Sequence, residues 1–161
     1  MITPNELHYV RNHGPVPRLF WETHILDINN GKMRLTMDDL VDKFEPINIP
    51  VMLACDGVRR GEMNLIRKSK GFTWGPAAMS NAFWKGARLT DVLKAAGVFR
   101  EDYDHSTKHY VHFEGADKPS EGVYATSIAF DYALDPMNDV ILAYEMVRYD
   151  LLRVQNSDVP C

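Results

Sequence analysis

The sequence predicts an α+β fold in which short helices accompany a mixed β-sheet. Apolar and β-branched residues gather in several short runs of strand type, and Gly, Asn and Pro turn signals separate these runs. Two other segments show the capped, one-sided pattern of a short helix. The 161 residues, 45% of them hydrophobic, are enough for one globular domain with its own core.

In the N-terminal half, a hairpin and a helix come before the strand that matters most. Residues 19–28 have strand composition, an Asn-Asn-Gly turn follows, and residues 32–35 return as the second strand. Thr36 then caps a short helix with one apolar face. Residues 47–54 form an apolar run, which predicts a buried strand that delivers Cys55 at its C-terminal end.

The C-terminal half predicts one helix and three strands. Thr90 has the position of an N-cap, and Gly97 has the position of a C-terminal stop, so we expect a capped helix between them. The strands are expected in residues 108–113, 123–128 and 140–146, with a polar loop at residues 117–122.

Composition excludes several classes of function. A net charge of -4 gives no reason to expect a nucleic-acid partner. The two cysteines, Cys55 and Cys161, make neither a disulfide framework nor a CxxC zinc pair, and His105 with His109 lacks a third ligand. No apolar run approaches the roughly 18 residues of a membrane span, and the N-terminus lacks the regions of a signal peptide. We therefore expect a cytoplasmic protein without membrane attachment.

The chemistry of the chain centres on Cys55, which is followed within five residues by an acid, a glycine and two arginines. The guanidinium groups of Arg59 and Arg60 would favour a thiolate, which attacks electrophiles and ligates soft metals. They would also grip an oxyanion, and Gly57 would let the turn approach a ligand closely. The alternative is an inert cysteine at the end of a core strand.

Two other segments offer binding groups. The loop at residues 11–17 contains two prolines and a glycine, and its Arg11 and His13 would hydrogen-bond an anionic ligand, although a solvated connection has the same composition. Trp74 lies in a glycine-framed aromatic segment, where it either walls a ligand pocket or belongs to a small satellite core.

Five stretches of the chain resemble a known family, in the family's order. They are residues 9–17 (Tyr-Val-Arg-Asn-His-Gly-Pro-Val-Pro), 54–60 (Ala-Cys-Asp-Gly-Val-Arg-Arg), 71–75 (Gly-Phe-Thr-Trp-Gly), 84–89 (Trp-Lys-Gly-Ala-Arg-Leu) and 140–146 (Val-Ile-Leu-Ala-Tyr-Glu-Met). Together they resemble the molybdenum-cofactor domain of the sulfite oxidase and eukaryotic nitrate reductase family. The resemblance implies a partial sulfite-oxidase-like molybdopterin-binding fold and molybdenum-molybdopterin as the cofactor.

The resemblance also implies site roles. In the family the motif cysteine is the protein's thiolate ligand to molybdenum, and this position is Cys55. The positions that serve the oxyanion substrate match Arg11, Arg60 and Trp74. The positions that hold the cofactor match Asn12, His13 and Cys55. The implied reaction is oxygen-atom transfer on a small oxyanion, with the metal carrying out the two-electron step.

The substrate is expected to be nitrate, which is reduced to nitrite. The Gly-Phe-x-Trp-Gly pattern at residues 71–75 and the opening at residues 3–9, which has fungal character, both resemble the nitrate reductase branch. Sulfite oxidation to sulfate and an inactive family fragment stay open as alternatives. A cysteine hydrolase built on Cys55 has no motif beyond the thiol to support it.

Two departures from the family are visible. Val58 stands where the family usually has an asparagine, and the resemblance stops after Met146. We therefore expect a partial molybdopterin-binding domain in residues 1–146, a divergent tail in residues 147–161, and a truncated product without the haem, FAD and dimerisation domains. Full-length relatives are expected to be homodimers, whereas this chain is expected to self-associate and to hold the cofactor weakly.

Overall fold

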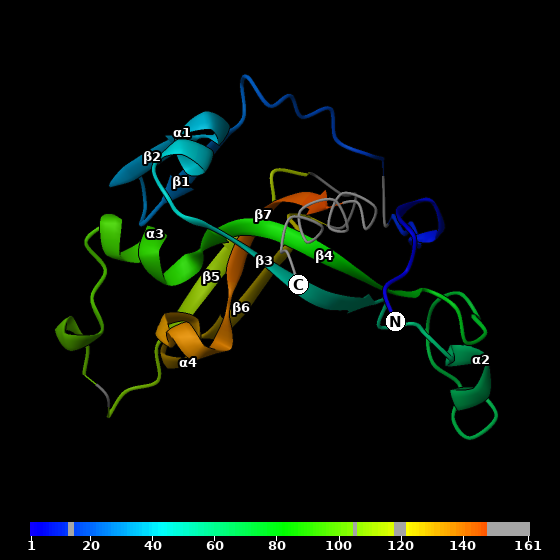
Figure 1. Cartoon of the computed structure of the whole chain (residues 1–161). Helices are drawn as coiled ribbons and strands as arrows, with labels where there is room; N and C mark the ends of the chain where they lie inside the picture. The colour runs from blue at the N-terminus through cyan, green and yellow to red at the C-terminus, as the bar shows by residue number, and fades with distance from the viewer. Residues whose placement is uncertain (13–14, 105, 118–121, 148–161) are drawn as a thin grey trace, which may run out of the picture. The chain divides into compact units, whose positions relative to one another are not determined.

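The computed structural model describes residues 1–12, 15–104, 106–117 and 122–147 (Figure 1). The strands are β1 (Ile25–Ile28), β2 (Met33–Thr36), β3 (Pro46–Ala54), β4 (Met79–Arg88), β5 (Tyr110–Glu114), β6 (Ala125–Ala129) and β7 (Ile141–Val147). The α-helices are α1 (Met37–Asp42), α2 (Arg60–Met63), α3 (Leu89–Ala95) and α4 (Phe130–Leu134). Short 3-10 turns occupy Asn5–Leu7, Arg100–Asp102 and Pro136–Asn138.

These elements confirm the α+β class, and they distribute the described strands over three sheets. β1 pairs with β2 and β5 pairs with β6, both antiparallel, while β3, β4 and β7 form a sheet in that order. The strands predicted in the C-terminal half are present as β5, β6 and β7. Most of the polar loop predicted before β6, residues 118–121, lies outside the described residues.

The chain divides into two compact units. One consists of Met1–Asn12, Asn48–Trp84 and Glu145–Cys161, and the other of His13–Ile47 and Lys85–Tyr144. The hydrophobic core belongs to the second unit, where α3 and α4 bury Val92, Leu93 and Phe130 against residues of the β1–β2 hairpin. The Cys55 stretch belongs to the first unit. Within the described part of the chain, no helix is both long and apolar enough to cross a membrane.

The predicted hairpin is present, with a shorter first strand. Ile25 pairs with Thr36 and Ile28 pairs with Met33. The turn places three residues in the left-handed region, which Asn and Gly tolerate best: Asn29 (φ 54°), Asn30 (φ 54°) and Gly31 (φ 83°). The Asn-Asn-Gly sequence therefore predicts this turn correctly. The strand does not begin at residue 19, because residues 20–24 form a turn in which the amide of His24 donates to the carbonyl of Phe20.

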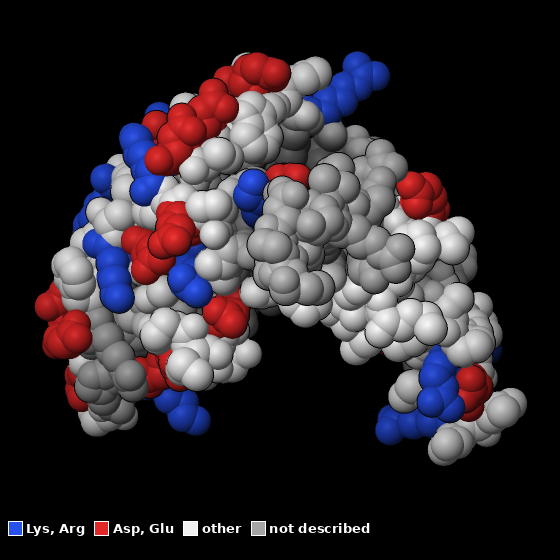
Figure 2. Space-filling model, in the orientation of Figure 1, with Lys and Arg blue, Asp and Glu red and all other residues white. Residues whose placement is uncertain are grey.

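The predicted cap of α1 is confirmed. The Oγ1 of Thr36 accepts from the amide of Asp39 at 3.0 Å, and the Oδ2 of Asp39 accepts from the amide of Thr36 at 3.1 Å. This reciprocal capping box satisfies two backbone donors that the helix leaves free. Leu40 is buried, and Asp39 forms an ion pair with Lys43 at 2.8 Å. Figure 2 shows the acidic side chains that gather over this helix.

The expectation of a buried strand at residues 47–54 is wrong. β3 has no buried residue, and Met52 and Leu53 are 63% and 40% exposed. The physical reason is its position at the edge of its sheet, since β4 lies between β3 and β7. Pro50 fits this position, because proline cannot donate to a neighbouring strand and is confined to edges. The strand nevertheless ends immediately before Cys55, as predicted.

The predicted start of α3 is also wrong. The helix begins at Leu89, and Thr90 lies buried inside it, where its hydroxyl donates to the carbonyl of Leu134 at 3.3 Å. A tertiary contact thus uses the side chain that was expected to cap the helix. The C-terminal stop is confirmed, because Gly97 has φ 71° and the amide of Val98 donates to the carbonyl of Leu93 at 2.9 Å.

Candidate functional site

The turn after β3 holds Cys55 in a fixed backbone frame. The amide of Cys55 donates to the carbonyl of Ala78 at 2.9 Å, and the carbonyl of Cys55 accepts from the amide of Val58 at 2.9 Å. The amide of Gly57 is directed at the Cys55 Sγ, 3.4 Å away. The thiol is unoxidised and partly exposed, so a soft metal could reach the sulfur.

The two adjacent arginines do different things, which the sequence could not reveal. Arg59 has a left-handed backbone (φ 61°), and its guanidinium binds the carboxylate of Glu62, with Nε 2.9 Å from Oε2. These hydrogen bonds from Arg59 hold the pKa of Glu62 below its ordinary value. Arg59, the N-cap of α2, thus forms an exposed ion pair with Glu62, and the expectation that both arginines grip an oxyanion stays a prediction.

Arg60 lies over two glycines. Its Nη1 donates to the carbonyl of Phe72 at 3.2 Å. Gly57 is buried, and a Cβ added there would lie 3.2 Å from the Arg60 Cζ and 3.3 Å from the Trp74 Nε1. A Cβ at Gly71 would collide with the Arg60 guanidinium. The fork of Arg60 and the indole N–H of Trp74 thus converge on the backbone of Gly57, two residues after Cys55.

Trp74 is fixed by backbone and ring contacts. Its carbonyl accepts from the amide of Gly61 at 2.8 Å, and the neighbouring carbonyl of Gly75 accepts from the amide of Arg59 at 2.9 Å. The guanidinium carbon of Arg11 lies 5.3 Å from the centre of the indole, at cation–π distance. Within the described part of the chain, the buried Nε of Arg11 has no hydrogen-bond partner. An unpaired buried donor is costly, and a ligand oxygen would relieve that cost.

The segment that carries Arg11 is tied to β4, a connection that sequence reasoning missed. The amide of Thr3 donates to the carbonyl of Asn81 at 2.8 Å, and the amide of Tyr9 donates to the hydroxyl of Ser80 at 3.0 Å. These partners are more than 70 residues apart in sequence, and nothing local in either stretch indicates the pairing.

Four of the six predicted site residues lie close together in the first unit: Arg11, Cys55, Arg60 and Trp74. Arg11 contacts the Trp74 ring, Arg60 and Trp74 lie over Gly57, and the Gly57 amide points at the Cys55 sulfur. Asn12 is exposed next to Arg11, and His13 lies outside the described residues. His105 also lies outside the described residues, so only His109 of the histidine pair is described. The centre of the His109 ring lies 5.1 Å from the centre of the Tyr103 ring. Among the described residues, no group of three or more His, Cys, Asp or Glu could hold a metal ion.

Comparison with known proteins decides the family. The profile of the oxidoreductase molybdopterin binding domain matches residues 13–155. The chain belongs to this family. Arg11 and Asn12 lie just before the matched range, whereas Cys55, Arg60 and Trp74 lie inside it. The family resemblance drawn from the five motifs is thereby confirmed.

Several curated proteins similar to this chain are named nitrate reductases. The chain is 48% identical over 149 residues to "Nitrate reductase [NADH] 1" of Oryza sativa subsp. japonica, a match that covers 89% of this chain and 16% of that protein. It is 41% identical over 151 residues to "Nitrate reductase [NADPH]" of Fusarium oxysporum, covering 90% and 16%. It is 40% identical over 156 residues to "Nitrate reductase [NADPH]" of Aspergillus niger, covering 93% and 17%.

The chain thus spans about one sixth of the length of these relatives. Identity to the two fungal proteins does not exceed identity to the Oryza protein, so the fungal character of the opening residues stays a prediction.

Proposed function

We propose that this chain is the molybdenum-cofactor domain of an oxidoreductase that reduces nitrate to nitrite. One structural observation carries the proposal: Arg60 and Trp74 converge over Gly57, two residues from the free thiol of Cys55. This arrangement sets a soft metal ligand beside a planar cationic fork that matches the oxygens of a small oxyanion. The family supports the cofactor, and relatives that are named nitrate reductases support the substrate.

The residues present suit a molybdenum-molybdopterin group. Cys55 offers the soft donor, and its partial exposure leaves room for the metal. The unpaired Nε of Arg11 suits an anionic group, and Asn12 and His13 follow it in the chain, where they would hold the pterin and its phosphate. When bound, the molybdenum group supplies two-electron oxygen-atom transfer.

The protein's own contribution is binding, orientation and exclusion of water. Arg60 holds the oxyanion through two parallel N–H donors, because its own position is fixed by the Phe72 carbonyl. Trp74 provides an apolar wall and an N–H at the same place. Arg11, seated on the Trp74 ring, adds a second positive charge that neutralises the anion.

The remaining expectations accompany this proposal. The small oxyanion is the partner, with neither nucleic acid nor membrane involved, and full-length relatives act as homodimers. A cytoplasmic location suits a protein whose site uses a free thiol, since reducing compartments keep thiols reduced. The division into a molybdopterin-binding part at residues 1–146 and a tail at residues 147–161 stays a prediction, and the family profile, which matches residues 13–155, extends past its boundary.

Turnover assays on protein loaded with the molybdenum cofactor test the proposal. We expect nitrite from nitrate with a reduced dye as electron donor, and little oxidation of sulfite with an oxidised acceptor. Sulfite oxidation without nitrite formation would move the chain to the other branch. Loaded protein that turns over neither anion would leave only the inactive-fragment alternative.

A further inference from the structure

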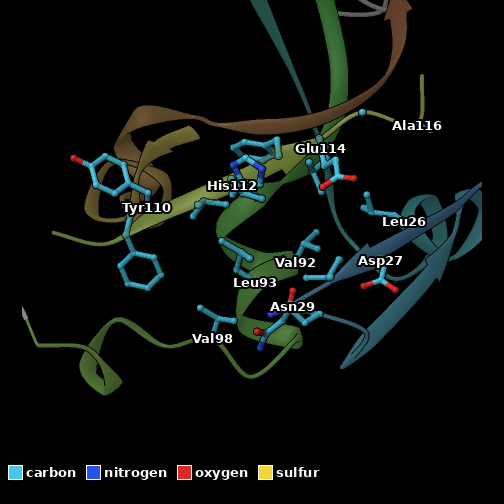
Figure 3. Close-up of a pocket in the computed structure, with 18 of the residues that line it drawn as sticks. Leu26, Asp27, Asn29, Val92, Leu93, Val98, Tyr110, His112, Glu114 and Ala116 are labelled. Carbon is cyan, nitrogen blue, oxygen red and sulfur yellow. The ribbon is translucent and has the colours of Figure 1, made fainter. Parts of the chain in front are cut away.

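A groove lies in the unit that does not contain the Cys55 turn. It is a groove of about 880 Å³, and every residue that lines it belongs to His13–Ile47 or Lys85–Tyr144 (Figure 3). Its floor is apolar, formed by side chains of α3 and its neighbours that include Val92, Leu93 and Val98. Nothing in the proposed oxidoreductase function uses this groove.

The walls of the groove are the edges of two strands. All four residues of β1 and all five of β5 line it, whereas β2 and β6 contribute none. Side chains alternate between the two faces of a strand, so a face would contribute only every second residue, and an uninterrupted run indicates the edge. Within the described part of the chain, β1 pairs only with β2 and β5 only with β6. Each wall therefore presents unpaired backbone N–H and C=O groups.

The charge of the groove has one sign. The described lining residues include the carboxylates of Asp27 and Glu114 and no Lys or Arg. Figure 3 shows Glu114 and His112 in the upper half of the view, whereas Asp27 lies lower, on β1 near Asn29. His112 is engaged with the Ser127 hydroxyl at 3.0 Å. A ligand with positive charges spaced along an apolar body suits this lining.

We propose that this groove binds a partner's extended polypeptide segment, in which apolar side chains alternate with Lys or Arg, by addition as a strand to the free edge of β5. The main chain of the segment pairs with β5, and its apolar side chains rest on the floor near Val92 and Leu93. Its basic side chains face Glu114 and Asp27 at the rim. β1 forms the opposite wall.

The proposal predicts hydrogen bonds between the backbones of the peptide and β5, which docking by side chains alone would not form. The test adds to the full chain a labelled short peptide that alternates Val or Ile with Lys, and follows binding by fluorescence anisotropy and amide hydrogen exchange. We expect saturable binding and slower exchange at Tyr110–Glu114. The same peptide with N-methylated amides keeps every side chain but loses donors, so its affinity should fall at least about tenfold.

A charge reversal with a matched control tests the rim. Glu114→Lys should weaken binding of the basic peptide by about fivefold, whereas Glu101→Lys, an exposed glutamate outside the groove, should leave it unchanged. Both positions are exposed, so both variants should fold.

Three results would overturn the proposal. They are no saturable binding, equal affinity for the N-methylated peptide, and binding that leaves exchange in β5 unaltered. Protection of β5 that instead rises with protein concentration, without peptide, would assign the edge to a second copy of the chain and would equally overturn it.

Discussion

Arg59 and Arg60 are the same residue type at adjacent positions, yet their surroundings separate them. The left-handed backbone at Arg59 turns its guanidinium to Glu62, while Arg60 lies over Gly57 beside Trp74. Identical side chains one position apart thus form an ion pair in one case and a candidate anion site in the other. This difference provides a matched pair of variants.

The first prediction uses that pair. Arg60→Lys keeps the charge but loses the planar fork, so kcat/KM for nitrate in the cofactor-loaded protein should fall by about tenfold or more. The Arg59→Lys variant should keep a kcat/KM near that of the parent protein, because the ion pair between Arg59 and Glu62 is exposed and contributes little to stability. Steady-state kinetics on both variants check this. Equal losses in the two would remove Arg60 from the site.

The second prediction concerns the glycine beneath the site. Gly57→Ala places a methyl group 3.2 Å from the Arg60 Cζ and 3.3 Å from the Trp74 Nε1, so both side chains must shift. We expect the KM for nitrate to rise by about tenfold, since small displacements of positioning groups are costly. Gly75→Ala is the control, because nothing lies within 4 Å of a Cβ at that glycine. An unchanged KM for Gly57→Ala would contradict the convergence of Arg60 and Trp74 on this backbone.

The sequence names candidate site residues, whose roles stay predictions, but part of their arrangement could not be predicted. Cys55, Arg60 and Trp74 were recognisable because each lies in a short motif whose chemistry is local. The separation of Arg59 from Arg60 depends on one backbone angle, and the attachment of the Arg11 segment depends on Ser80, far along the chain. Such long-range contacts leave no local pattern.

At the scale of elements, the capping residues of α1 lower the pKa of a carboxyl group in the helix. The hydrogen bonds and charge of Lys43, together with Thr36, lower the pKa of Asp39 from 3.8 to about 2. Because the folded pKa is lower than the unfolded one, the Asp39 contribution to stability is present above about pH 4 and is lost as the pH falls toward about 2.

The third prediction follows from this cap. Carboxyl chemical shifts measured against pH should show Asp39 titrating near 2, and Thr36→Ala should raise that pKa while costing about 1 kcal/mol in the free energy of unfolding. Lys43→Met is the companion variant, which should also raise the pKa of Asp39 but leave the Thr36 bond to the helix intact. Titration of Asp39 at its ordinary value in the parent protein would contradict the capping box.

Elements governed by local chemistry were predicted, and those governed by tertiary position were not. The hairpin turn and the cap of α1 depend on residues within a few positions, so they were readable. The sequence does not predict β4, because Ser80, Asn81 and Gly86 interrupt its apolar pattern. Gly86 is required by a tertiary contact, since a Cβ there would collide with the backbone of Leu142. The exposure of β3 and the burial of Thr90 also depend on tertiary neighbours. The edge position in the sheet decides the first, and a contact with Leu134 of α4 decides the second.

At the scale of the whole molecule, the segment after the site leaves apolar side chains in water. Met63, Leu65, Ile66 and Phe72 are 64%, 87%, 93% and 76% exposed. Apolar residues at such exposure favour association when they cluster in one segment.

The fourth prediction is therefore self-association of the chain. Sedimentation at increasing concentration should show oligomers, and the double variant Leu65→Lys with Ile66→Lys should shift the population toward monomer. Met137→Lys, which changes an apolar residue that is 85% exposed in the other unit, is the control and should leave the distribution unchanged. A parent protein that stays monomeric over the whole concentration range would refute this expectation.

The fifth prediction tests the central claim that Cys55 ligates the metal at this site. X-ray absorption at the molybdenum edge, on protein loaded with the cofactor, counts the sulfur neighbours of the metal directly. We predict that Cys55→Ser loses one sulfur neighbour and retains less molybdenum per chain after gel filtration, because a hydroxyl is a hard and poorly ionised replacement for a thiolate. An identical sulfur count and an identical molybdenum content in the parent protein and in Cys55→Ser would contradict the account.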